Sequence, residues 1–300
     1  MASGMPLLVD ALQPNGSEEI VLHPLLAGMQ AQLLRRRRQW FVCADKDPLD
    51  LYASLVEQAP AALIAAACDT ILPACRQLWV ASPYHAMLGR DSVRLMPDVA
   101  MPWDEADARW LCDTLNGFLA EEGIQLMAVG AALMLSCEKS LDTCPAPFAS
   151  ISGGLMPNRH PDGPDGGRMM RLVAEIQMFL HNKSQPTREG KPTVSGLWLW
   201  GASPHPVKGS PRFFAVATRN PFLHAVADGR DARTIISECE RFETLLPASG
   251  LPDVMLLCGA GHALLLSKAL LPRMHRGWWP ASPGPESQLL GKLRGIAYAA

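Results

Sequence analysis

The two strongest secondary-structure signals in the chain lie in RMMRLVAEIQMFLHNKSQPTREGKPTVSGLWLWG, residues 168–201. Residues 168–181 predict an amphipathic helix, because apolar side chains recur on one face at helical spacing at Met169, Leu172, Val173, Ile176 and Leu180. Residues 182–192 are polar and contain proline and glycine, which indicates a loop. Residues 194–201 are apolar and rich in tryptophan, which predicts a buried strand.

The flanking sequence continues this alternation of helices and strands. A helix is predicted to follow Asp104, which can form a capping box with Asp107, and to end at Gly123. A shorter buried helix is predicted over residues 61–73, and another helix over 231–246. Strands are predicted over residues 78–81, 86–88, 92–96, 125–129, 132–137, 213–217, 254–258 and 263–267. The sequence therefore predicts an α/β fold, in which a mixed sheet carries helices on its faces.

The domain organisation is predicted from composition. Residues 18–34 show helical spacing, so we expect residues 1–60 to form an N-terminal helical segment and residues 61–300 to form the α/β domain. The Pro/Gly-rich residues 145–168 either form a binding loop or divide that domain into two docked lobes. The four arginines at 35–38 are interpreted as a solvated helix end, with a phosphate-binding site as the alternative.

Composition excludes several classes of protein. The chain has 300 residues, of which 48% are apolar and 19% charged, so wholesale disorder is excluded. No run of about 18 apolar residues is present, which excludes a membrane-spanning helix. The first ten residues lack a basic region followed by an apolar one, so we expect no secretory signal and a cytoplasmic protein.

Charge is unevenly distributed along the chain. Residues 1–150 hold 10 Lys/Arg against 18 Asp/Glu, a net charge of −8, and residues 151–300 hold 17 against 11, a net charge of +6. Either the two halves attract each other or the basic half binds a small anion. The pI of 6.4 lies far below the value above about 9 that is typical of a nucleic-acid-binding domain.

Motifs for cofactors and metals are absent from the sequence. There is no phosphate-binding P-loop, no dinucleotide fingerprint after a strand, no G-x-S-x-G and no H-E-x-x-H. The eight cysteines lack the close spacing of a zinc site, and we expect them to be reduced and mostly buried. The glycines at 259–261 are interpreted as a turn between two strands. The sequence thus predicts no cofactor and no metal centre.

Several segments resemble a known family. They are WVASPYHAMLGRDSVRLM (79–96), DTLNGFLAEEG (113–123), EIQMFLH (175–181), the TREGKP loop and VSGLWLWG (194–201). Together they resemble the proteobacterial cofactor-independent phosphoglycerate-mutase-like proteins over about residues 78–201. The resemblance implies an alkaline-phosphatase-like core and an active site with two divalent metals held by Asp and His.

This chain departs from the pattern of the resembled family. Ser82 and Ser195 stand where the family has aspartate and asparagine, the loop asparagine is replaced near residues 185–187, and residues 202–203 replace glycines. The sequence has no Asp-His dipeptide and no D-G-x-G-D near its N-terminus. The core is therefore interpreted as a degenerate form of the alkaline-phosphatase-like fold, without the two-metal centre.

The candidate site residues come from the resembling segments. Gln177 and His181 share a helix face, and Trp198 and Trp200 point to the same side of the predicted strand. One interpretation is a ligand pocket with indole walls. The other is a buried polar network in which the tryptophans belong to the core. The full set of binding candidates is Glu175, Gln177, His181, Arg188, Trp198, Trp200 and His85.

Two functions follow from the sequence. The leading one is a cytoplasmic, phosphoglycerate-mutase-like protein that is catalytically degenerate and acts as a binding, regulatory or assembly factor. Its partner would be a protein, a second copy of the chain or a small anionic ligand, with no signal for nucleic acid or membrane. The alternative is a metal-dependent phosphotransferase or phosphate-ester hydrolase with a remodelled site. Enzymatic activity is left open, and the missing metal and nucleophile signatures favour its absence.

Overall fold

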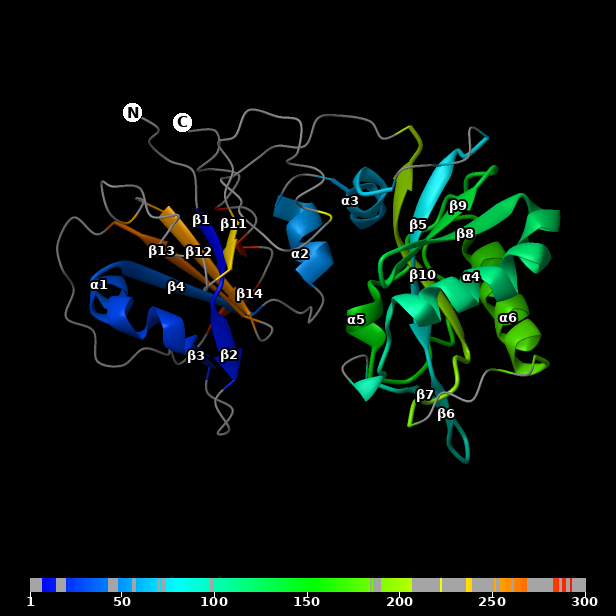
Figure 1. Ribbon diagram of the computed structural model, residues 1–300, viewed down its shortest axis with the longest axis horizontal. Helices are drawn as coiled ribbons and strands as arrows, with labels where there is room; N and C mark the ends of the chain where they lie inside the picture. Colours follow the sequence, from blue (N-terminus) through cyan, green and yellow to red (C-terminus); the bar gives the residue numbers. More distant parts are fainter. Residues whose placement is uncertain are drawn as a thin grey trace. The chain divides into compact units, whose positions relative to one another are not determined.

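The computed structural model divides the chain into two compact units. One comprises residues 1–57 and 211–300, and the other residues 58–210. The residues that the structure describes are 7–14, 20–42, 48–55, 58–68, 71, 74–97, 100–183, 185, 190–206, 222, 236–238, 251, 254–259, 262–268, 283–285, 288–289 and 292. Both units combine strands with flanking helices, which confirms the α/β class (Figure 1).

The first unit contains a mixed sheet. In sheet order its described strands are β11 (Ile236–Glu238), β1 (Leu7–Asp10), β12 (Val254–Gly259), β13 (His262–Ser267), β4 (Arg37–Val42) and β14 (Gly284–Pro285). Strand β1 is parallel to both of its neighbours, whereas β13 is antiparallel to β12 and β4. The pairing of Gly259 with His262 at the ends of β12 and β13 confirms the predicted turn between two strands.

Shorter elements accompany this sheet. They are the β2–β3 pair (Leu12–Pro14 and Ile20–Leu22), η1 (Pro24–Met29), α1 (Gln30–Leu34) and α2 (Pro48–Leu55). Leu26 of η1 and Leu33 of α1 are buried in one cluster with Trp40, Leu257 and Leu264 of the sheet. The hydrophobic core of the unit therefore joins segments from both ends of the chain.

The expectation of a helical N-terminal segment is wrong for much of residues 1–60. Strands β1 to β4 occupy a large part of the described residues there, and helix is confined to η1, α1, α2 and the first residue of α3. The physical reason is that β1 is a short apolar strand between two parallel neighbours. Such a strand has no alternating pattern to distinguish it from helix.

The arginine run is not simply a helix end. Arg35 and Arg36 follow α1, but Arg37 and Arg38 begin strand β4. The guanidinium of Arg36 donates a hydrogen bond to the carbonyl oxygen of Leu251 at 3.1 Å, so it ties two distant segments of the first unit together.

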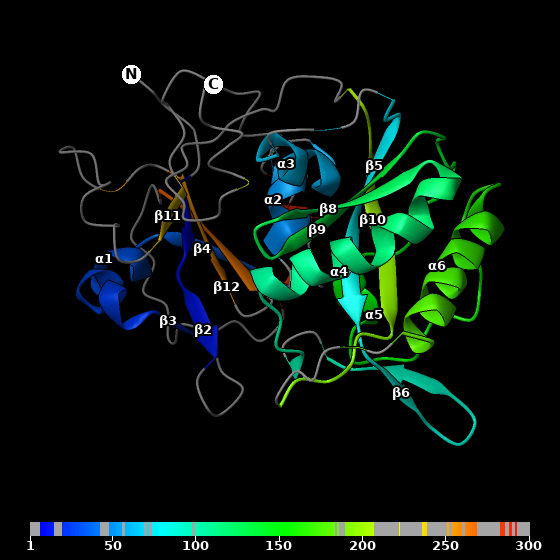
Figure 2. The same ribbon diagram turned by 45° about the vertical axis from the view of Figure 1, so that its right-hand side comes forward.

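The second unit is built on an antiparallel sheet. Its described strands are, in sheet order, β10 (Gly196–Pro204), β5 (Gln77–Tyr84), β9 (Ala132–Cys137) and β8 (Ile124–Val129). Helices α4 (Glu105–Leu119) and α6 (Gly166–His181) pack on one face, and α3 (Pro60–Ala66) and α5 (Phe148–Ile151) contact β10 from the other (Figures 1 and 2). The turn η3 (Ala120–Glu122) and a hairpin of β6 (Ala86–Leu88) and β7 (Val93–Leu95) complete it.

Most sequence predictions in this unit are confirmed. Helix α4 begins with the expected capping box, because the Asp104 side chain accepts from the Asp107 amide at 3.0 Å and the Asp107 side chain accepts from the Asp104 amide at 3.1 Å. Gly123 ends η3 in the left-handed conformation, with φ of 69°. Helix α6 buries the predicted face at Met169, Leu172, Val173, Ile176 and Leu180.

The predicted division near residues 145–168 is corrected. This segment lies inside the second unit, where the Cys144 amide donates to the Asp162 carbonyl at 2.8 Å and the Trp198 indole donates to the Ala146 carbonyl at 2.8 Å. The predicted helix over residues 231–246 is also wrong at 236–238, which form β11. Its other residues and the predicted strand at 213–217 lie outside the described part of the chain. None of the described helices combines the length and apolar character that a membrane span requires.

Candidate functional site

The candidate site starts from the solvent-facing side of α6. Ala174, Gln177, Met178 and His181 occupy positions i, i+3, i+4 and i+7, so they form one continuous stripe along the helix. The opposite stripe is buried against the sheet. The buried stripe fixes the rotation of α6 about its own axis, and that rotation presents Gln177 and His181 together.

Two connecting segments meet beside this stripe. His85 follows β5, and its Nδ1 lies 2.8 Å from the carbonyl oxygen of Thr193, just before β10. Because a carbonyl can only accept, Nδ1 carries the proton, and Nε2 is the nitrogen left to accept a proton or a hydrogen bond. The Ala86 amide donates to the Ser195 hydroxyl at 2.8 Å. These two contacts hold the start of the β6–β7 hairpin against the start of β10.

A third segment closes the same region. The Gln185 side chain donates to the Val194 carbonyl at 2.7 Å and accepts from the Val194 amide at 2.9 Å. One amide side chain thus satisfies both backbone groups of a residue at the entrance to β10, which lies at the edge of the sheet. The bonds fix this residue of the polar loop beside α6.

Together these segments enclose a cleft of about 750 Å³, which we call the α6 cleft. This volume is within the range of about 300–1,000 Å³ that is common for small-molecule sites. Lys183 and two histidines lie on its lining, which includes no Asp or Glu among the described residues. Its described lining residues are His85, Ala86, Leu88, Ala174, Gln177, Met178, Leu180, His181, Asn182, Lys183, Gln185, Thr193, Val194 and Ser195.

Gln177 and His181 have unused hydrogen-bonding groups in the cleft. Gln177 is half-buried and His181 exposed, and neither side chain has a hydrogen-bond partner among the described residues. The polar-network interpretation required them to satisfy backbone groups of the Pro-rich loops. The described residues contain no such bonds, so these two side chains are accessible to a ligand.

Trp198 and Trp200 do not line the α6 cleft, so the predicted indole walls are corrected. Both rings are buried on the sheet face opposite α6, where the Trp200 indole donates to the Ser82 hydroxyl at 2.8 Å. The predicted alternation is correct, since Leu197 and Leu199 belong to the α4–α6 core. Helices α3 and α5 contact β10 on the face that carries the indoles, and both rings are almost fully buried, so they belong to the protein core.

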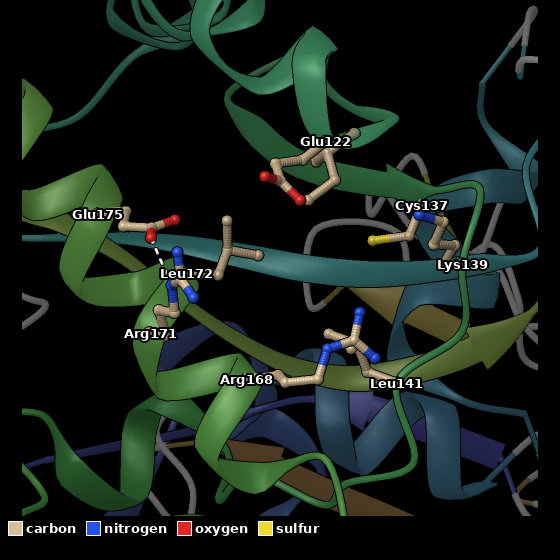
Figure 3. Close-up of a pocket in the computed structure, with 9 residues that line it drawn as sticks. Glu122, Cys137, Lys139, Leu141, Arg168, Arg171, Leu172 and Glu175 are labelled. Atoms are coloured by element: carbon tan, nitrogen blue, oxygen red, sulfur yellow. Dashed lines mark hydrogen bonds and ion pairs between the residues drawn. The ribbon is translucent and has the colours of Figure 1, made fainter.

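Glu175 lies on another side of α6. Residues two positions apart in a helix point about 200° apart around its axis, so Glu175 cannot share a face with Gln177. Its carboxylate accepts a hydrogen bond from the Arg171 guanidinium at 2.7 Å, which raises the pKa of Arg171. Figure 3 shows this pair beside a smaller cavity of about 180 Å³, which Glu122, Arg168 and Lys139 also line.

Arg188 lies outside the described residues, but the end of its loop is fixed. Lys191 Nζ lies 2.5 Å from Asp104 Oδ2 and 2.9 Å from Asp107 Oδ2. The hydrogen bond to Lys191 lowers the pKa of Asp104, and the bonds to both carboxylates raise the pKa of Lys191. The TREGKP loop is therefore joined to the beginning of α4 by an ion-pair cluster.

The structure also bears on metal binding. Within the described part of the chain, no three His, Cys, Asp or Glu side chains are grouped as metal ligands would be. Burial raises the pKa of Cys112 to about 11 and that of Cys137 to about 12, so both thiols are protonated at neutral pH.

Sequence reasoning missed several residues of the cleft, chiefly Lys183, Gln185, Thr193 and the exposed Met178. The signal for Met178 was present, because it falls on the same helical stripe as Gln177 and His181. Thr193 had no local signal, since it reaches His85 only through the pairing of β5 with β10.

Comparisons with known proteins identify no family for this chain. No family model matches the chain, and the search of curated proteins gives no match. Among solved structures the chain is similar to the PH0037 protein from Pyrococcus horikoshii, with 10% sequence identity and a TM-score of 0.47. That alignment covers 100% of this chain and 99% of the other.

Proposed function

We propose that this chain is a cytoplasmic, phosphoglycerate-mutase-like protein that is catalytically degenerate and binds a small anionic ligand in the α6 cleft. The observation that carries the proposal is the lining of the cleft. Lys183, His181 and His85 supply the charged or chargeable groups there, and no carboxylate stands among the described lining residues. Such a lining attracts an anion and leaves no acidic side chain to repel it.

Accessible hydrogen-bond donors support the same ligand. The Gln177 amide has donors without a partner among the described residues, and a protonated His181 would add charged ones. Lys183 Nζ lies 4.9 Å from the centre of the Phe179 ring, within the range of a cation–π contact. Lys183 and His181 also offset the partial negative charge at the C-terminal end of α6. An anion placed between these groups would replace its hydration with charge-assisted hydrogen bonds.

The absence of catalysis rests on the sequence. The chain has no Asp-His dipeptide and no Asp-rich motif of the kind that holds two metals in the resembled mutases. Elemental analysis of the purified protein, together with turnover of p-nitrophenyl phosphate, tests this part. Two equivalents of Mn or Zn with measurable turnover would favour the metal-dependent phosphotransferase or hydrolase instead.

The binding role is tested by calorimetric titration with inorganic phosphate and 3-phosphoglycerate. The double substitution Gln177→Leu with His181→Leu should leave the melting temperature nearly unchanged, because neither side chain has a described protein partner. It should weaken binding by about tenfold or more, on the usual scale for hydrogen bonds to charged groups.

Glu175→Gln is the matched control, since it removes a charge from the same helix outside the cleft. Its binding should equal that of the unmodified chain. Equal binding by the double variant, or no binding of either anion by the unmodified chain, would contradict the proposal.

A further inference from the structure

The α6 cleft carries exposed apolar side chains beside its polar groups. Leu88 is 84% exposed and Met178 is 66% exposed, and both line the cleft. Exposed leucines and methionines have no role in binding inorganic phosphate. Their shared position in a cleft points to a ligand with an apolar part.

The β6–β7 hairpin presents one apolar face to the cleft. Side chains alternate along a strand, so Ala86 and Leu88 of β6 share a face and Met87 points away. Ala86 and Leu88 line the cleft and Met87 does not. The hairpin projects beyond the sheet (Figure 2), and its turn is closed by a hydrogen bond from the Gly89 amide to the Ser92 carbonyl at 2.8 Å.

The helix supplies the facing apolar wall. Ala174 and Met178 are one turn apart on α6, and the buried Leu180 and Val194 complete the apolar lining. His181 and Lys183 lie beyond them, towards the end of the helix. From Ala174 to His181 the helix axis advances about 10 Å, so His181 lies at the C-terminal end of the stripe and Gln177 lies beside Met178.

The size of the cleft also exceeds what a small anion needs. A volume of about 750 Å³ lies in the upper part of the range of about 300–1,000 Å³ that is common for drug-sized ligands. Inorganic phosphate or a three-carbon phosphate ester would occupy a small part of this space. Leu88 and Met178 line the same cleft.

We infer that the ligand is a soluble amphipathic anion, a phosphate or carboxylate joined to an apolar chain of about octyl length. This inference rests on the proposed function. The head group binds at Gln177, His181 and Lys183, and the chain lies between Leu88 of the hairpin and Met178 of α6. Covering these two side chains removes apolar surface from water, so affinity should increase with the length of the ligand's chain.

The test is a calorimetric series on the full-length chain with inorganic, ethyl, butyl and octyl phosphate, all kept monomeric. Each buried methylene should tighten binding by about fourfold, which corresponds to about 0.8 kcal/mol. Octyltrimethylammonium, which has the same chain and the opposite charge, should not bind. The double substitution Leu88→Ser with Met178→Ser should weaken octyl phosphate binding at least tenfold and leave inorganic phosphate binding unchanged.

Met87→Ser is the matched control, because it alters the same hairpin on its other face; it should bind octyl phosphate normally. Three outcomes would overturn the inference while leaving the proposed function intact. The first is equal affinity for inorganic and octyl phosphate, and the second is a chain-length effect that survives the double substitution. The third is binding to phosphatidylglycerol vesicles with no preference for monomeric octyl phosphate over inorganic phosphate. Failure of both inorganic and octyl phosphate to bind would refute the proposed function itself.

Discussion

Gly196→Ala should destabilise the second unit, although the backbone at this position suits alanine. An ideal Cβ at residue 196 would lie 2.4 Å from the Tyr84 hydroxyl oxygen and 2.6 Å from its Cζ. Residues 196 and 84 are directly opposed on β10 and β5, so the phenol lies across the glycine. Tyr84 is 1% exposed, which leaves its ring little room to move aside.

The magnitude follows from two opposing terms. Overpacking a buried site costs about 1–3 kcal/mol, whereas replacing glycine by alanine stabilises a compatible backbone by about 0.4–1 kcal/mol through the unfolded chain. In a Tyr84→Leu background the Cβ at residue 196 no longer overlaps the phenol, so only the stabilisation through the unfolded chain remains. We therefore expect the methyl group to destabilise the unmodified protein and to stabilise the Tyr84→Leu protein, with a coupling free energy of about 2 kcal/mol or more.

The assay is urea unfolding of the four proteins of this double-mutant cycle, followed by tryptophan fluorescence. Trp79, Trp198 and Trp200 are buried in the second unit and report on its unfolding. Effects of the two substitutions that add within about 0.5 kcal/mol would refute the reasoning. That result would mean that the Tyr84 ring does not occupy the space above Gly196.

Four further substitutions, of which Met178→Ala is a control, test the packing and the ion pairs of the second unit. Ile176→Ala should cost about 2–5 kcal/mol by chemical denaturation because its side chain is fully buried, whereas Met178→Ala on the exposed stripe of α6 should cost little. Trp200→Phe should cost about 1 kcal/mol in the same assay, because it removes the hydrogen bond from the buried indole to the half-buried Ser82 hydroxyl. Lys191→Met should lower the stability measured near pH 7. The difference in the free energy of unfolding between this variant and the unmodified chain should shrink below about pH 3.8, because Asp104, whose pKa is lowered, becomes protonated there. It should also shrink above about pH 10.5, because Lys191, whose pKa is raised, loses its charge there.

The part of the fold that the sequence predicted is the part set by local chemistry. The capping box of α4 uses two side chains three residues apart, and the apolar stripe of α6 uses spacing within one helix. Strand β1 could not be recognised in this way. Its conformation depends on β11 and β12, which are more than two hundred residues away in the sequence.

The candidate site shows the same division between local and distant information. Helical spacing placed Gln177 with His181, and the same spacing separates Glu175 from them. The approach of His85 to Thr193 spans 108 residues and depends on the register of β5 with β10. Strand alternation correctly paired Trp198 with Trp200. It could not tell which helices would contact each face of the sheet, and the face that carries the indoles is contacted by α3 and α5.

Ser82 and Ser195 are both engaged in hydrogen bonds inside the protein. Ser82 accepts from the Trp200 indole and Ser195 accepts from the Ala86 amide, each at 2.8 Å. Both hydroxyls thus act as short internal acceptors that hold the core and the hairpin in place. A side chain engaged in this way gives up stability if it turns to a ligand, whereas Gln177 and His181 lose no described bond. We therefore propose that recognition in this chain falls to the α6 stripe and Lys183, whereas Ser195 holds the hairpin wall of the cleft in position.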